Sequence, residues 1–283
     1  MRTRSFFAKV NGARLKIETL GPQDAPAILI HHGAPGLSSR LEPLESFGAF
    51  ADSYRIVTFD ARGSGESADD GPFTHEQWVA DIEEIRQQLD LGKIVMAGGS
   101  YGGFMALEYT LAHPENVSAL ILRDTAANTD HDEAAKQIAR SSNRSIDPWA
   151  LDRIATGTFT SNEEFERYWR AILPLYEFDY VPETAEKVAS STHYHYRTHN
   201  YAFATNMLSY DLKPRLPEIT CPVLVIVGRH DWRTPVAASQ DIAENIRGSE
   251  IVIFEKSGHS PPLEEPERFQ SLVRDFLRRA GVA

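Results

Sequence analysis

One stretch, Lys93–Gly103, constrains the fold of this chain more than any other part of the sequence. It begins with apolar, β-favouring residues and then reaches a glycine-rich corner around a single serine, Gly98-Gly-Ser-Tyr-Gly102. From Tyr101 to His113, apolar residues recur at the spacing of a helix. The stretch therefore predicts a strand, a sharp turn and a helix, with Ser100 on the turn. Glycines are needed beside such a serine because strand and helix pass too closely there for side chains.

The same alternation of strands and helices continues on both sides of this stretch. Asn11-Gly12 predicts a hairpin at the start of the chain. Continuous apolar runs predict buried strands of a parallel sheet at 27–31, 54–59, 117–122, 223–228 and 251–254. Helical patterns follow, one capped by Ser38 or Ser39 and running to about Phe50, and others spanning about 74–91, 235–246 and 265–280. The predicted fold is α/β, with its functional loops at the carboxyl ends of the strands.

This alternation stops near Asn128 and resumes near Leu212. The intervening residues show helical segments rich in aromatic and charged residues, at 134–142, 162–173 and 185–206. An insertion between two strands of a parallel sheet lies over the carboxyl edge, where it can cover the serine. We therefore predict a core formed by residues 1–127 and 212–283, and a helical cap or lid formed by residues 128–211.

Three polar residues follow three of the predicted strands. A serine hydroxyl is a weak nucleophile at neutral pH, so Ser100 needs a base and a third group that orients the base. His259, in Ser257-Gly-His-Ser-Pro261, and Asp231, in Gly228-Arg-His-Asp231, occupy loops after strands. We predict Ser100, Asp231 and His259 as a catalytic triad. Asp231 could instead cap the next helix, and Asp124 is the reserve acid.

A tetrahedral intermediate also needs preorganised donors for its oxyanion. One predicted donor is the backbone N–H of Tyr101, at the start of the helix after the serine. The second should come from the loop His32-Gly-Ala-Pro-Gly36, and Ala34 is the residue we predict. The alternative is that this segment is a loop without a catalytic role.

His193, His195 and His199 suggest a metal site, because His195 and His199 would share one helix face. The segment lacks the glutamate of an H-E-x-x-H motif, and no carboxylate or cysteine completes a set. We predict no metal there, and expect these histidines and the nearby tyrosines to line or brace the cap. Cys221 is the single cysteine, and its place before an apolar strand indicates a packed residue rather than a nucleophile.

A net charge of -11 argues against nucleic acid and anionic membrane surfaces as partners. The first ten residues contain only a short apolar run that Lys9 interrupts, which does not fit a secretory signal. With no stretch long enough to span a membrane, we expect a cytoplasmic location. The expected partner is a small-molecule or short-peptide substrate, and the sequence leaves the oligomeric state open.

The loop motifs together resemble the prolyl iminopeptidase branch of the α/β-hydrolase superfamily. That branch carries HGGPG, D-x-R-G-x-G-x-S and a GGSWG-type elbow, for which this chain has His32–Gly36, Asp60–Ser67 and Gly98–Gly103. Ala34 replaces the second glycine of HGGPG, and Tyr101 replaces the tryptophan after the serine. The resemblance implies an α/β-hydrolase fold with a mostly parallel eight-stranded sheet, a helical cap inserted after the sixth strand, a Ser-Asp-His site and no cofactor.

The predicted function is that of a serine hydrolase acting through an acyl-enzyme, with an aminopeptidase or amidase activity on small substrates such as N-terminal proline. In the family this activity uses acidic cap residues that hold the substrate amino group. The cap residues available for this are Glu163, Glu164, Glu166, Glu177, Asp179, Glu183 and Glu186. A carboxylesterase or lactonase of the same fold is the alternative, and a ligand-sensing receptor built on a hydrolase fold is a further one.

Overall fold

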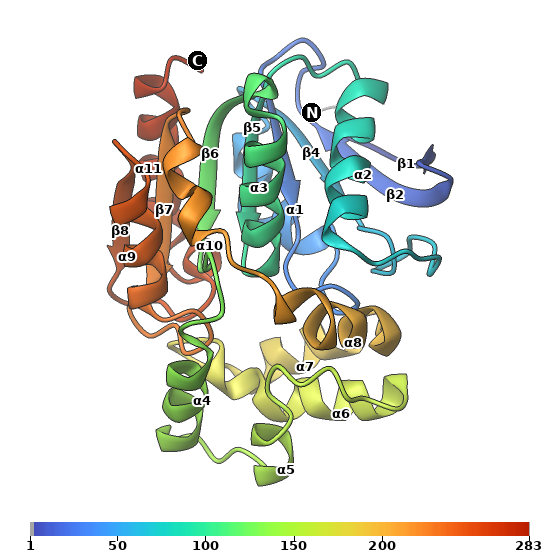
Figure 1. The fold of residues 1–283 in the computed structure, drawn as a ribbon, viewed down its shortest axis with the longest axis vertical. Coiled ribbons are helices and arrows are strands. Elements are labelled where there is room, and N and C mark those ends of the chain that lie inside the picture. Colours follow the sequence, from blue (N-terminus) through green and yellow to red (C-terminus); the bar gives the residue numbers. More distant parts are fainter. Residues whose placement is uncertain (1–2, 283) are drawn as a thin grey trace.

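The computed structural model describes residues 3–282 and contains one eight-stranded sheet with the strand order β1-β2-β4-β3-β5-β6-β7-β8 (Figure 1). The strands are β1 (Thr3–Val10), β2 (Ala13–Leu20), β3 (Ala27–His31), β4 (Arg55–Phe59), β5 (Ile94–Gly99), β6 (Val117–Arg123), β7 (Val223–Gly228) and β8 (Glu250–Phe254).

Most of this sheet is parallel. Strands β1 and β2 form an antiparallel hairpin, and β2 also pairs antiparallel with β4, whereas the pairs from β4 through β3 to β8 are parallel. The hairpin turns at Asn11 and Gly12, whose φ angles of 42° and 87° suit the two-residue turn that matches strand twist. The predicted fold class, a mostly parallel eight-stranded sheet, is confirmed.

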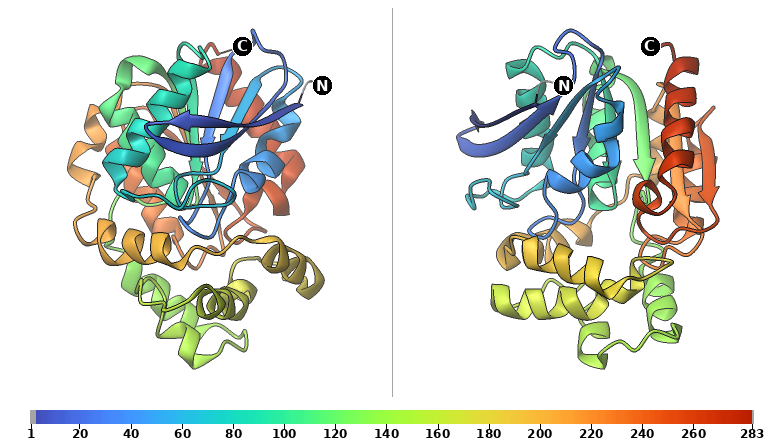
Figure 2. Two further views of the ribbon diagram at one scale, coloured as in Figure 1. Left: turned by 90° about the vertical axis from the view of Figure 1, so that its right-hand side faces the viewer. Right: turned by 180° about the vertical axis from the view of Figure 1, so that it is seen from behind.

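Helices cover both faces of the sheet (Figure 2). On one face, α2 (His75–Gln88), α3 (Tyr101–Ala112) and α9 (Val236–Asn245) bury apolar residues such as Trp78 and Ile242. On the other face, α1 (Leu41–Phe47) and α11 (Pro266–Arg279) bury Phe47 and Phe269. Alternate residues of β5 enter these two cores, and each fully buried large apolar side chain contributes roughly 1.5–3 kcal/mol. Strand β5, which leads into the turn at Ser100, is therefore packed against apolar residues on both faces of the sheet.

A group of helices follows β6 and lies beyond the carboxyl edge of the sheet (Figures 1 and 2). We call residues 128–211 the cap. Its helices are α4 (Asp132–Ser141), α5 (Pro148–Leu151), α6 (Asn162–Ile172), α7 (Pro182–Ser191) and α8 (Tyr196–Ala204). The chain then returns to the sheet through β7, and α10 (Pro261–Glu264) precedes the last helix. The insertion after the sixth strand is as predicted.

Two local predictions were wrong. Residues 185–206 do not form one helix, because the chain breaks between α7 and α8, where the backbone N–H of His195 donates to the Gly36 carbonyl at 2.8 Å. The first helix of the core starts at Leu41, with Arg40 rather than Ser38 or Ser39 at its N-cap position. Its first flanking residue is Arg40, whose guanidinium is held by Asp60 and Glu66 at 2.7 Å each. In both places a contact from a distant part of the chain overrides the local pattern.

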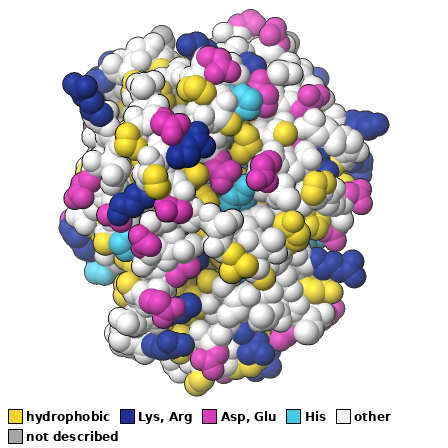
Figure 3. Space-filling model, viewed as in Figure 1, with side chains coloured by type: hydrophobic (Ala, Val, Ile, Leu, Met, Phe, Trp, Pro, Cys, Tyr) yellow, Lys and Arg dark blue, Asp and Glu magenta, His cyan; other side chains and the backbone are white. Residues whose placement is uncertain are grey.

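Within residues 3–282, none of the helices combines the length and the apolar character that crossing a membrane requires. The face seen in Figure 3 carries acidic and basic side chains side by side.

Candidate active site

Ser100 occupies a strained turn between β5 and α3. Its φ and ψ angles are 54° and -126°, a conformation that costs a residue with a side chain on the order of 1–3 kcal/mol. A Cβ on Gly98 would lie 2.0 Å from the Gly102 carbonyl oxygen, and one on Gly102 would lie 2.2 Å from the His31 carbonyl oxygen. The glycines around the serine are therefore needed for the close approach of strand and helix, and Ser100 itself is only half-buried.

Asp231 and His259, from the loops after β7 and β8, come together at the same edge. Asp231 Oδ1 lies 2.9 Å from His259 Nδ1, and both residues are buried. The separation is that of a hydrogen bond, although the imidazole is not aligned for a straight one. Asp231 also accepts from the backbone N–H groups of Arg233, at 2.8 Å, and Thr234, at 3.1 Å. The aspartate thus orders the entry to α9 and contacts the imidazole, so its two predicted roles coexist.

Arg123 ties the serine loop to the histidine loop. The Ser100 N–H donates to the Arg123 carbonyl at 2.9 Å, while Arg123 Nη1 donates to the His259 carbonyl at 3.1 Å. Among residues 3–282, His259 Nε2 has no hydrogen-bond partner and the Ser100 hydroxyl makes no hydrogen bond. The imidazole nitrogen that a base needs is therefore unoccupied beside the loop that holds the serine.

A second buried carboxylate, Asp124, stands next to this pair. One carboxylate oxygen of Asp124, one of Asp231 and one ring nitrogen of His259 all lie within 4.8 Å of one another. Asp124 Oδ1 accepts from the Gly228 N–H at 2.9 Å, and Oδ2 lies 3.5 Å from Arg123 Nη1. Burial and the neighbouring Asp231 charge raise the pKa of Asp124 well above the ordinary carboxyl range. Asp124, the reserve acid of the sequence analysis, therefore lies close to Asp231 and His259. It binds its proton more tightly than an ordinary carboxyl group does.

Burial opposes the charged form of His259, but the charge of Asp231 and its contact with the ring outweigh burial and raise the pKa of His259 above 6.5. Asp124 adds to this increase.

Asp124, Asp231 and His259 are ligand types that can hold a metal ion. Beside a serine on an elbow turn, a carboxylate–imidazole pair has the composition of a nucleophile-activating site.

The loop that contains Ala34 packs against the serine turn. A Cβ on Gly33 would lie 3.7 Å from the Ser100 Cβ, and the Ala34 carbonyl accepts from the N–H groups of Leu37 and Ser38. In the described part of the chain, neither the Ala34 nor the Tyr101 N–H donates to another protein atom. Both predicted oxyanion donors are thus free to bind a ligand oxygen.

A largely buried chain of hydrogen bonds begins at the hydroxyl of Tyr101, whose N–H is a predicted oxyanion donor. His75 Nδ1 donates to Glu108 Oε1 at 2.6 Å, and the Tyr101 hydroxyl lies 2.6 Å from His75 Nε2. Sequence reasoning missed this chain. The available signal was Tyr101 at the position where the family has a tryptophan, because a buried tyrosine hydroxyl needs a hydrogen-bond partner of its own.

Tyr176, from the cap, was also missed. Its ring stands edge-on to the His259 ring with the centroids 5.2 Å apart, and its carbonyl accepts from the His259 N–H at 2.7 Å. The cap therefore holds the histidine loop directly.

His195 and His199 lie in different surroundings. His195 precedes α8 and its Nε2 lies 3.0 Å from the Gly65 carbonyl oxygen. His199 is buried, with its ring centroid 4.3 Å from that of Phe165 and 4.4 Å from that of Phe203. The shared helix face expected for His195 and His199 does not exist, because His195 lies outside the helix.

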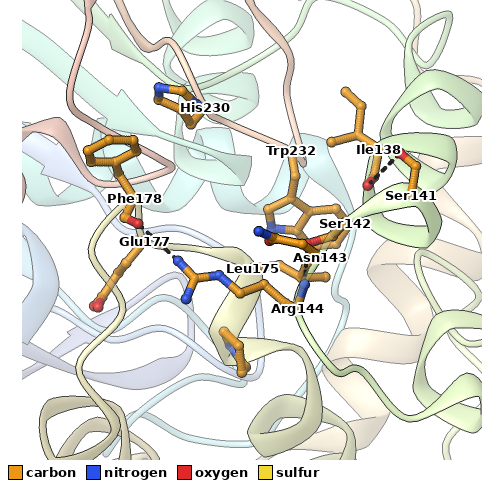
Figure 4. A pocket seen from close by; sticks show the side chains of 11 residues that line it. Ile138, Ser141, Ser142, Asn143, Arg144, Leu175, Glu177, Phe178, His230 and Trp232 are labelled. Carbon is orange, nitrogen blue, oxygen red and sulfur yellow. Dashed lines mark hydrogen bonds between the residues drawn. The ribbon is translucent and has the colours of Figure 1, made fainter.

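The acidic cap residues mostly face solvent or other cap residues. Glu166 and Glu186 pair with Arg170, and Glu164 accepts from Thr160. Glu177 is half-buried and lines a pocket of about 670 Å³ beside the site, shown in Figure 4. Arg144 crosses this pocket and donates to the Phe178 carbonyl at 2.9 Å, while the His230 ring stacks on Phe178. Ser100 is not among the residues that line it.

The mostly parallel sheet and the polar loops at its carboxyl edge are those of one class of proteins. The family model described as alpha/beta hydrolase fold matches residues 26–266, and the chain belongs to that family. It is a hydrolase.

Among curated proteins, the proline iminopeptidase PfmaB of Pestalotiopsis fici is 31% identical over 96% of this chain and 99% of its own length. The proline iminopeptidase of Lactobacillus helveticus is 27% identical over 90% of each chain. A solved structure of a thermophilic esterase from Thermogutta terrifontis matches with a TM-score of 0.77 and 26% identity, covering 98% of this chain and 99% of the other. The predicted resemblance to proline iminopeptidases is confirmed.

Proposed function

We propose that this protein is a serine hydrolase that acts through an acyl-enzyme. His259 Nε2 takes the proton of the Ser100 hydroxyl as the oxygen attacks the substrate carbonyl, and Asp231 orients the imidazole and stabilises its charged form. The N–H groups of Ala34 and Tyr101 bind the oxyanion. The imidazolium gives its proton to the leaving group, and water, activated by the same histidine, then releases the acid and restores Ser100.

The observation that carries this proposal is the 2.9 Å contact between Asp231 and His259, both buried, beside a serine on a strained elbow. The bridging of the two loops by Arg123 supports it, because both loops are anchored to the same residue. The cap contact of Tyr176 supports a role of the cap as a lid over the site.

Covalent labelling tests the mechanism. A fluorophosphonate probe should modify wild-type protein at Ser100 and leave Ser100→Ala unmodified, because the reaction needs an activated hydroxyl. Ser46→Ala, on α1, is the matched control and should be labelled like the wild type. Wild-type protein that binds small esters but is never labelled would favour the ligand-sensing alternative.

Within this class, we propose aminopeptidase or amidase activity on small substrates, supported by the two iminopeptidase relatives. A specific observation favours a carboxylesterase or lactonase as the second candidate. The acidic cap residues that would hold a substrate ammonium group are largely turned outward, whereas the guanidinium of Arg233, next to the Asp231 loop, is largely buried.

A substrate panel separates these two candidates. Proline and alanine arylamides should be compared with short acyl esters and acyl lactones, each with Ser100→Ala as the blank. Turnover of arylamides with a preference for proline would support the aminopeptidase. Rapid ester or lactone hydrolysis with inert arylamides would refute it and leave the serine hydrolase proposal intact.

A further inference from the structure

Arg233 is the one charged side chain that reaches from the loop of the catalytic acid toward the underside of the cap in the part of the chain that the structure describes. Arg233 follows Asp231 by two residues, and its backbone N–H donates to Asp231 Oδ1. The same carboxylate oxygen contacts His259. The Arg233 side chain is 12% exposed. Its charge is therefore held in a largely desolvated place beside the candidate catalytic residues.

Aromatic residues of the cap surround the guanidinium. The Arg233 Cζ lies 6.0 Å from the ring centroid of Phe203, whose own ring is 5.7 Å from that of Tyr101. Its charge also acts on the hydroxyls of Tyr168 and Tyr176, opposing the burial that raises their pKa values. Tyr176 in turn packs on His259, and Phe203 packs on Tyr101, so cap residues near the guanidinium also contact the proposed base and the residue proposed as an oxyanion donor.

One nitrogen of the guanidinium is held by a carboxylate, and the other two make no hydrogen bond to the described residues. Arg233 Nη1 donates to Asp132 Oδ1 at 2.7 Å, and this carboxylate, at the start of α4, is 29% exposed. Within residues 3–282, Nε and Nη2 donate to no protein atom. These two N–H groups form the side-on fork of the guanidinium, whose spacing matches the two oxygens of a carboxylate.

We propose that Arg233 binds a free carboxylate of the substrate, so that this enzyme acts on small acidic esters, amides or lactones. The inference rests on the proposed serine hydrolase function and specifies its substrate class. Asp132 positions the guanidinium, and the Nε and Nη2 groups receive the carboxylate. A chain with a net charge of -11 repels anions overall, so a local buried cation is what an anionic substrate requires.

Matched substrates test this on both sides of the scissile bond. On the acyl side, the mono-4-nitrophenyl ester of glutaric acid is compared with 4-nitrophenyl pentanoate, which has a methyl group in place of the carboxylate. On the leaving-group side, 4-acetoxybenzoate is compared with 4-acetoxybenzamide. We expect wild-type enzyme to prefer the charged member of one pair by at least about tenfold in kcat/KM.

Three variants separate recognition from a merely structural ion pair. Arg233→Gln should reduce that preference at least about tenfold, and Arg233→Lys, which keeps the charge without the fork, should keep part of it. Arg229→Gln removes a charge from the same loop, where Arg229 pairs with the exposed Glu255, and should keep the wild-type preference. Circular dichroism and thermal unfolding verify that each variant folds.

A binding measurement makes the inference independent of turnover. Ser100→Ala should bind glutarate in a calorimeter, and the Ser100→Ala/Arg233→Gln double variant should bind it at least about tenfold more weakly. Equal kcat/KM for both members of both pairs, with glutarate binding unaffected by Arg233→Gln, would overturn the inference and leave the serine hydrolase standing. If no ester is cleaved and no probe labels Ser100, the proposed function fails, and calorimetry alone then decides whether Arg233 binds carboxylates.

Discussion

The backbone of Gly258 lies against the carbonyl group of Tyr176 so closely that a Cβ at position 258 would stand 2.4 Å from that oxygen. The same carbonyl accepts the hydrogen bond of the His259 N–H. One atom of the cap thereby sets the position of the loop that contains the candidate base. A side chain at position 258 must separate the two.

We expect Gly258→Ala to lower kcat/KM by at least about tenfold, because a displacement of about 1 Å at a catalytic group has large effects on rate. Gly48→Ala is the matched control, since a Cβ there meets no atom within 4 Å and the residue has a helical φ. Steady-state kinetics of both variants provide the measurement. Equal activity would show that the contact between cap and loop does not position His259.

The two buried acids should differ in importance. Asp231→Asn removes the charge that faces the imidazole, and we expect kcat to fall about 10³–10⁴-fold, as for the orienting aspartate of a serine triad. If Asp124 acts as a reserve acid, the Asp231→Asn/Asp124→Asn double variant should be less active than Asp231→Asn. Ester hydrolysis at saturating substrate measures both, and identical residual rates would exclude the reserve role.

The pH profile should carry the signature of His259. In the proposed mechanism the neutral imidazole is the base, so kcat/KM should rise with pH through the pKa of His259, which lies above 6.5. Because the Asp124 charge contributes to that increase, Asp124→Asn should move the acid limb to lower pH. If the acid limb does not move, the charge of Asp124 has no effect on the pKa of His259.

Acid should destabilise the fold through three buried histidines. Burial lowers the pKa of His31 to about 3, that of His32 to about 4 and that of His199 to about 3. Between pH 6.5 and about 4 the unfolded chain binds protons on these residues and the folded chain does not, so the free energy of unfolding falls as pH falls. Each histidine alone contributes up to about 1.4 kcal/mol per pH unit.

Denaturant titrations from pH 7 to pH 4.5 measure this slope. His199→Gln should make it shallower by about one proton. An unaltered slope in His199→Gln would mean that His199 is protonated in the folded protein.

The hydrogen-bond chain behind Tyr101 should contribute to stability as a unit. Tyr101→Phe leaves His75 Nε2 without its partner, and we expect a loss of about 1–3 kcal/mol in the free energy of unfolding. Glu108→Ala removes the other end of the chain. If the three residues act together, the double variant loses less than the sum of the single losses, whereas full additivity would indicate independent contacts.

Local sequence determined the elements of the core and the residues that could carry chemistry. The glycines around Ser100, the Asn11-Gly12 turn and the buried apolar runs act through backbone sterics and burial, which depend on near neighbours in the chain. They also located Asp231 and His259 in loops after strands, and parallel topology then required those loops to share an edge. The insertion after β6 followed from the same pattern, whereas the order of the strands in the sheet came from the structure.

Only the tertiary structure decided which side chains meet across the site. Tyr176 on His259, His75 on Tyr101 and Asp132 on Arg233 join segments whose separation along the chain carries no periodic signal. The break between α7 and α8 arose in the same way, because a core carbonyl at Gly36 captured the His195 N–H. Local propensities are worth at most about 1 kcal/mol per residue, so a single tertiary hydrogen bond or buried charge can override them.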